Sequence, residues 1–154
     1  MGLGVLMDER RRERTERGNA AVEFALVMVP LIVLLFGVVQ YSLYFWALQG
    51  GSDVARSAAR MASVGNPPDC ASFTSAVRGQ VGSLMASGSV ATVQRTYTEQ
   101  NPGTVTVGDM VTVTVSFSTP NLHFPFIPFI NNGLVRTSAQ SRVDFVPSQP
   151  QACP

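Results

Sequence analysis

Residues 18–24, Gly18-Asn-Ala-Ala-Val-Glu-Phe24, separate two parts of the sequence that differ sharply in character. Residues 1–17 before them carry five arginines and four acidic residues and should form a charged, solvated head. Residues 24–52 are 29 positions without one charged side chain. A helix of that length would measure about 43 Å, which exceeds the roughly 30 Å hydrocarbon core of a bilayer. The stretch therefore predicts a membrane helix that begins next to Glu23.

The overall composition agrees with a membrane protein. Charged residues make up 14% of the 154 residues, against about 25% in soluble globular proteins. We place the membrane span at about residues 24–46, with Tyr41, Tyr44 and Trp46 in an aromatic belt at one interface. The arginines of the head should stay in the cytoplasm under the positive-inside rule, which places the C-terminal part on the other side of the membrane.

The C-terminal part, residues 65–154, reads as one small domain, and the expected fold class is α+β. The glycine pair at residues 50–51 is expected to break or flex the long helix, and Asp53 to cap a further turn. A short helix should then start at Asp69 and run to about Ser87. An antiparallel sheet should follow, with one hairpin through Gly-Asp. Its strands are expected at residues 90–97, 104–107, 110–117 and 134–145.

Two features of this domain allow more than one interpretation. Cys70 and Cys153 match no metal-binding spacing; in an exported domain they would form one disulfide, and otherwise they are two free thiols. Residues 120–130 hold three prolines and three phenylalanines, which excludes a regular strand ladder. This segment either folds over the sheet or exposes an apolar patch to a partner or to lipid. The patch would consist of Phe124, Phe126 and Phe129.

Catalysis is not expected from this sequence. His123 is the only histidine, and no nucleophile–base motif, phosphate-binding loop or metal-ligand cluster accompanies it. We therefore predict no enzymatic activity, no metal and no cofactor. Without residues 1–18 the chain carries six arginines and six acidic residues, so no basic surface for nucleic acid remains.

Gly18 followed by four neutral residues, Glu23, an aromatic residue and a long apolar helix resembles the prepilin peptidase site of type IV pilin-like proteins. The longer string, which continues with Pro-Leu-Ile-Val-Leu-Leu-Phe-Gly at residues 30–37, is similar to TadE-like proteins. These are minor pseudopilins of the Tad (tight adherence) Flp pilus system. Asp-Val-Ala-Arg-Ser-Ala-Ala-Arg at residues 53–60 resembles the helix that follows their membrane segment. The resemblance covers about residues 15–64.

The resemblance implies that the chain is a precursor. A prepilin peptidase would cleave between Gly18 and Asn19 and remove residues 1–18 as a leader. Gly18 suits this role because glycine leaves the backbone unhindered at the scissile bond. Glu23, next to Phe24, would then pair with the new α-amino group of Asn19 on a neighbouring subunit.

The resemblance further implies a role in pilus biogenesis for the helix of residues 19–64. Its partners would be the prepilin peptidase, other pilin-like subunits of the Tad system and membrane lipid. The protein would lie in the bacterial cytoplasmic membrane or enter the pilus. Two alternatives remain open: Glu23 is an interfacial carboxylate that simply faces water, or the whole chain is an uncleaved, single-pass binding protein of the cell envelope.

Overall fold

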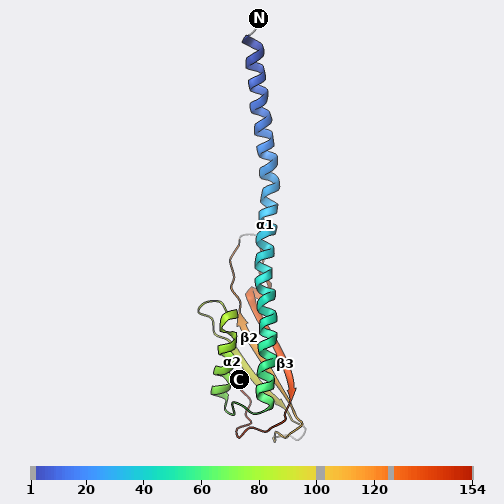
Figure 1. Cartoon of the computed structure of the whole chain (residues 1–154), viewed down its shortest axis with the longest axis vertical. Helices are drawn as coiled ribbons and strands as arrows, with labels where there is room; N and C mark the ends of the chain where they lie inside the picture. The colour runs from blue at the N-terminus through green and yellow to red at the C-terminus, as the bar shows by residue number, and fades with distance from the viewer. Residues whose placement is uncertain (1–2, 100–102, 125–126, 154) are drawn as a thin grey trace. The chain divides into compact units, whose positions relative to one another are not determined.

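The computed structural model describes residues 3–99, 103–124 and 127–153, with side chains from Asn19 onward (Figure 1). It confirms the α+β class, with a long N-terminal helix, a short second helix and a three-stranded antiparallel sheet. The elements in chain order are α1 (Leu3–Ser63), α2 (Cys70–Val81), η1 (Gly82–Leu84), β1 (Thr92–Thr98), β2 (Met110–Ser118), η2 (Ile130–Gly133) and β3 (Leu134–Arg142).

The first of two compact units consists of α1 up to Val39 together with Phe124 and Ile127. Asn19–Ser63 is the one helix among the described residues that is long and apolar enough to cross a membrane, with a mean hydropathy of 2.7 in its most apolar window. None of its side chains between Asn19 and Val39 is buried. A helix that is apolar all round and exposed requires another apolar environment, and lipid provides one.

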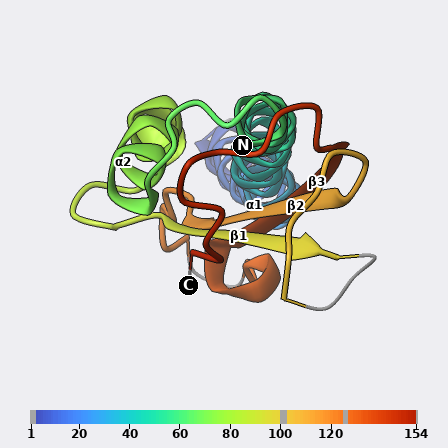
Figure 2. The ribbon, with the colours of Figure 1, turned by 90° about the horizontal axis from the view of Figure 1, so that it is seen from below.

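The second unit is built on the sheet β1-β2-β3, in which neighbouring strands are antiparallel. The C-terminal part of α1 and the whole of α2 cover the same face of this sheet (Figure 2). The strand expected at residues 110–117 is confirmed, and on that face every second residue of β2 is at most 1% exposed. These buried residues are Val111, Val113, Val115 and Phe117.

The expected helix break at Gly50-Gly51 is wrong, because α1 continues through both glycines to Ser63. A Cβ atom on Gly50 would lie 2.8 Å from two methyl carbons of Leu84, and one on Gly51 would lie 2.9 Å from Cε1 of Phe117. The two glycines therefore allow α1 to pack closely on the rest of the domain, rather than allowing it to bend. Buried alanines extend this surface along α1, at Ala47, Ala55, Ala58, Ala59 and Ala62.

The expected strand at residues 104–107, and with it the hairpin, is also wrong. The N–H and the hydroxyl of Thr106 both donate to the carboxylate of Asp109, at 2.7 and 3.1 Å. The N–H of Asp109 donates back to the carbonyl of Thr106 at 3.2 Å. This local turn takes the place of strand pairing, because an aspartate side chain readily hydrogen-bonds nearby backbone. β2 pairs with β1 and β3 instead.

The second helix begins where the sequence predicted. The Asp69 carboxylate accepts a hydrogen bond from the Ser72 N–H at 2.8 Å and so caps α2. The hydrogen bonds from Ser72 hold the pKa of the Asp69 carboxyl below its ordinary value, because they favour the charged form. α2 ends at Val81, and η1 continues the chain for one further turn. Four apolar residues at helical spacing in this segment are buried: Phe73, Val77, Val81 and Leu84.

The last strand is shorter than expected at its C-terminal end. β3 ends at Arg142, whereas the sequence predicted a strand up to Phe145. The N–H groups of Asp144 and Phe145 donate to the carbonyl of Ser63 at 2.9 and 3.0 Å, which closes the end of α1. The unpaired carbonyl groups at a helix end need such partners, so this contact competes with further strand pairing.

Candidate functional site

The residues expected to be processed lie within α1. Gly18 belongs to the helical backbone, and the side chains of Asn19, Glu23 and Phe24 are exposed. Asn19 and Glu23 are four residues apart, so they occupy one side of the helix about one turn apart. Glycine and asparagine are poor helix formers, so the helix is intrinsically less stable at Gly18-Asn19 than at the alanines that follow.

Glu23 carries the charged group closest to the apolar stretch. Among the side chains that the structure describes, none forms an ion pair or hydrogen bond with it. A carboxylate at the boundary of an apolar helix is costly to leave without a cation or water. Within the described part of the chain, Glu23 is therefore free to accept an external partner.

Exposed apolar side chains cover α1 from Val22 to Val39. Leu26 is 73% exposed and Phe24 is 64% exposed, so the described residues of the chain leave this surface open. Such a surface in a folded protein marks contact with lipid or with another apolar helix. The large apolar side chains that are at least partly open in this way include Val22, Phe24, Leu26, Val27, Val29, Leu31, Ile32, Leu34, Leu35, Phe36, Val38 and Val39.

Gln40 marks the end of this open surface, because it is only 2% exposed. Its side-chain amide donates to the Pro120 carbonyl at 3.4 Å, and its side-chain oxygen accepts from the Leu122 N–H at 3.0 Å. Both polar ends of the glutamine are therefore satisfied, as buried polar groups require. From Gln40 onward α1 is part of the folded domain, and the open stretch of residues 19–39 would measure about 31 Å as a helix.

The aromatic belt predicted at residues 41–46 is only partly at the surface. Tyr44 is 7% exposed and belongs to the core, which contradicts its expected place at a membrane interface. The Tyr41 hydroxyl donates to the Pro128 carbonyl at 2.8 Å, and Trp46 is 53% exposed. The predicted span of residues 24–46 thus includes positions that pack within the domain.

The proline- and phenylalanine-rich segment packs against α1. The ring of Phe124 stacks on Phe36 with centroids 4.5 Å apart, and the ring of Phe129 meets Tyr44 edge-on at 5.9 Å. Phe126, the third residue of the expected partner-contact patch, lies outside the described residues. Both rings contact α1, and Phe129 also lies against Gly133, just before β3, and packs on the core.

Cys70 and Cys153 form a disulfide that links the start of α2 to the C-terminal segment. Beside it lies Arg95, a residue that the sequence analysis did not single out. Arg95 is completely buried, and its Nη2 donates to the Gln151 carbonyl at 3.2 Å. Its position in the apolar alternation of β1, between Val93 and Tyr97, was the available signal.

The guanidinium of Arg95 lies between two aromatic rings. Its central carbon is 4.8 Å from the centroid of Phe73 and 5.7 Å from that of Tyr97. Cation–π attraction of this kind helps to offset the cost of burying a charge. Burial raises the pKa of the Tyr97 hydroxyl, while the charge of Arg95 opposes that rise. The cluster supports the C-terminal segment and shows no accessible reactive group.

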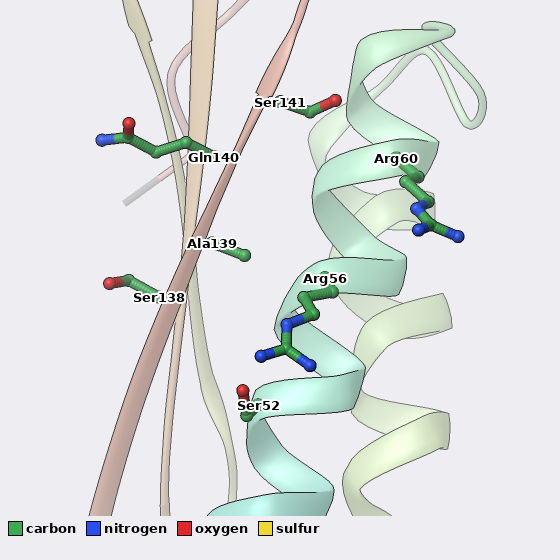
Figure 3. Close-up of a pocket in the computed structure, with 7 residues that line it drawn as sticks. All are labelled: Ser52, Arg56, Arg60, Ser138, Ala139, Gln140 and Ser141. Carbon is green, nitrogen blue, oxygen red and sulfur yellow. The ribbon is translucent and has the colours of Figure 1, made fainter.

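An open polar groove of about 420 Å³ lies between α1 and β3 (Figure 3). Arg56 at its edge forms an exposed ion pair with Asp53, at 3.4 Å, which contributes little to stability. The groove contains no acid and no histidine, so it offers hydroxyl and guanidinium groups but no general base. Its lining residues are Ser52, Arg56, Arg60, Ser138, Ala139, Gln140 and Ser141.

The fold and the open helix define a class: a protein whose single long apolar N-terminal helix fits a single-pass membrane anchor and whose C-terminal part is a small α+β domain. Within that class, residues 18–60 match the model of the family of TadE-like proteins. The chain is therefore similar to TadE-like proteins over this part, and the predicted resemblance is confirmed there. No curated protein and no solved structure matches the chain.

Proposed function

We propose that this protein is a minor pilin-like subunit that acts in biogenesis of Tad (Flp-type) pili. The observation that carries the proposal is the match to TadE-like proteins, which begins at Gly18 and includes the whole open apolar stretch. In this proposal a prepilin peptidase cleaves after Gly18. The protein then acts by assembly through α1 with other pilin-like subunits, and it performs no catalysis.

The exposed carboxylate of Glu23 supports the assembly step. Cleavage would leave an α-amino group on Asn19, and such a group is largely protonated at neutral pH. A carboxylate and an ammonium group that meet where water is scarce attract each other far more strongly than in water. Glu23 of one subunit would therefore pair with the Asn19 amine of its neighbour and set the axial offset between two apolar helices.

Replacing Gly18 with leucine is expected to block maturation. A bulky side chain at the scissile bond restricts the backbone and stabilises the helix there, so the peptidase cannot open and hold the bond. We expect mass spectrometry of the protein from cells with an active prepilin peptidase to show Asn19 as the N-terminus of the wild type. The Gly18→Leu variant should retain the residues that precede Asn19.

Gly37→Ala is the matched control, because Gly37 also lies in α1 and an added Cβ there would meet nothing within 4 Å. This variant should be processed like the wild type. An intact leader on the wild-type protein in the same cells would overturn the proposed processing. It would favour the alternative of an uncleaved, membrane-anchored binding protein.

Replacing Glu23 with glutamine is expected to reduce pilus formation strongly without preventing cleavage. The change removes a charge but preserves size, and loss of one partner from a desolvated ion pair costs about 2–5 kcal/mol. Pili on cells that carry the variant as their only copy can be counted by electron microscopy, with the N-terminus checked by mass spectrometry. Asp53→Asn is the control, because Asp53 is exposed and pairs only with the neighbouring Arg56 among the described side chains. Normal piliation with Glu23→Gln would identify Glu23 as a carboxylate that simply faces water.

A further inference from the structure

The loop that connects β2 with η2 runs along α1 from Gln40 to Phe36, in the last turn of the open apolar stretch. It is attached at Gln40, which bonds the backbone of Pro120 and Leu122. It is attached again at Tyr41, whose hydroxyl donates to the Pro128 carbonyl. Between these two attachments, Phe124 stacks on Phe36.

The position of Phe36 shows how far this loop extends along α1 from Gln40. Phe36 lies four residues before Gln40, which is about one helical turn or 6 Å along α1. Phe36 is itself part of the open apolar stretch, and the described tip residues Phe124 and Ile127 group with that part of α1 in one compact unit. Whatever environment surrounds the last turn of the open stretch therefore also surrounds the tip of the loop.

Several of the described N–H groups of the loop have partners within the protein. The N–H of Leu122 donates to Gln40, that of His123 to the Asn121 side chain at 2.9 Å, and that of Ile127 to the Phe124 carbonyl at 3.4 Å. The three prolines of residues 120–130 have no N–H group to satisfy. Irregular backbone enters the boundary of a bilayer at acceptable cost only when such groups are satisfied within the protein.

We propose that this loop is a second membrane contact, in which Phe124 and Ile127 insert at the bilayer surface nearest Phe36, in the last turn of the open stretch. The partner is the lipid itself, at the boundary between headgroups and acyl chains. This inference rests on the membrane anchoring in the proposed function. Lipid is favoured over a protein partner because Phe124 stacks on Phe36, which lies in the last turn of the open apolar surface of α1. Tyr41 fits the same boundary, since it offers an aromatic body and a polar tip.

Tryptophan fluorescence of the full-length chain in lipid vesicles tests this contact. Trp46 is the only tryptophan, so Trp46→Phe gives a silent background into which Phe124→Trp is introduced. The probe should emit at short wavelength and lose most of its emission to phospholipids brominated near the headgroup. Iodide in the aqueous phase should quench it weakly.

Two control positions make the result interpretable. Leu31→Trp lies in the middle of the open stretch and is expected to be quenched by lipid brominated deeper in the acyl chains. Val90→Trp lies in the domain at a side chain that is 71% exposed, and it should respond to iodide only. Ile127→Trp serves as a second probe, because it leaves the stacking of Phe124 on Phe36 intact.

Two different failures can be told apart. If Leu31→Trp escapes quenching by brominated lipid, the anchoring in the proposed function is wrong. If Leu31→Trp is quenched while Phe124→Trp and Ile127→Trp behave like Val90→Trp, the loop lies in water and the inference is overturned. Protection of both loop probes from lipid and from iodide would overturn it equally, because the tip would then be covered by protein.

Discussion

Replacing both Cys70 and Cys153 with serine is expected to lower the free energy of unfolding of the domain by about 4–5 kcal/mol. The disulfide joins residues 83 positions apart, and a closed loop of that length removes about this much chain entropy from the unfolded state. A small domain has a total stability of only about 5–15 kcal/mol. The double variant should therefore be largely unfolded near 37 °C, as measured by urea denaturation of the full chain in detergent.

The native contacts of the C-terminal segment should weaken together with the disulfide. The backbone groups of Arg95 and Cys153 exchange hydrogen bonds at 3.0 and 2.8 Å, and these bonds hold the segment beside β1. Wild-type protein treated with a reductant is the control, and its denaturation midpoint should coincide with that of the double variant. An unchanged midpoint in both samples would mean that the core alone holds the domain together.

Replacing Gly51 with valine is expected to destabilise the domain by about 3 kcal/mol, the upper end of the usual cost of overpacking a core. A Cβ atom at this position would lie 2.9 and 3.1 Å from two ring carbons of Phe117 and 3.3 Å from the Thr137 hydroxyl. The Phe117 ring is 1% exposed and lies in the core, and protein cores are closely packed. Either α1 must shift away from the sheet or the ring must leave its position. Urea denaturation measures the loss.

The same substitution at Gly79 provides a matched control. Gly79 is also a helical glycine, in α2, but an added Cβ there would meet nothing within 4 Å. Valine has a slightly better helix propensity than glycine, so Gly79→Val should change stability by less than about 0.5 kcal/mol. Equal effects at the two positions would show that helix propensity, rather than close packing against Phe117, determines the role of Gly51.

The sequence alone predicted the structure correctly where a local pattern of residues determines it. The uncharged run after Glu23 predicted the long helix, and Asp69 predicted the start of α2, because both depend on neighbouring residues. The alternation of valine and threonine in β2 likewise predicted its buried face. The family match over residues 18–60 rests on the same local string.

The sequence alone did not predict the structure where contacts between distant segments determine it. A glycine pair allows either a bend or close packing, and only the positions of Leu84 and Phe117 show which applies at Gly50-Gly51. Gln40 lies within the predicted span of residues 24–46, and only its hydrogen bonds to the backbone of Pro120 and Leu122 show that it belongs to the folded domain. Residues 104–107 have strand-like composition, but the nearby Asp109 side chain closes them into a turn.

The domain has no linker to the helix that carries it. Residues 40–63 of α1 are part of the domain itself, since Ala47, Ala55 and Ala58 of this helix are completely buried in its core. This part of the helix and the sheet therefore move together as one packed body. A torque applied at Gln40 must turn the whole domain, and a push along the axis must carry it the same distance. In the proposed assembly, the domain would therefore make the same rotation or axial step as this part of the helix.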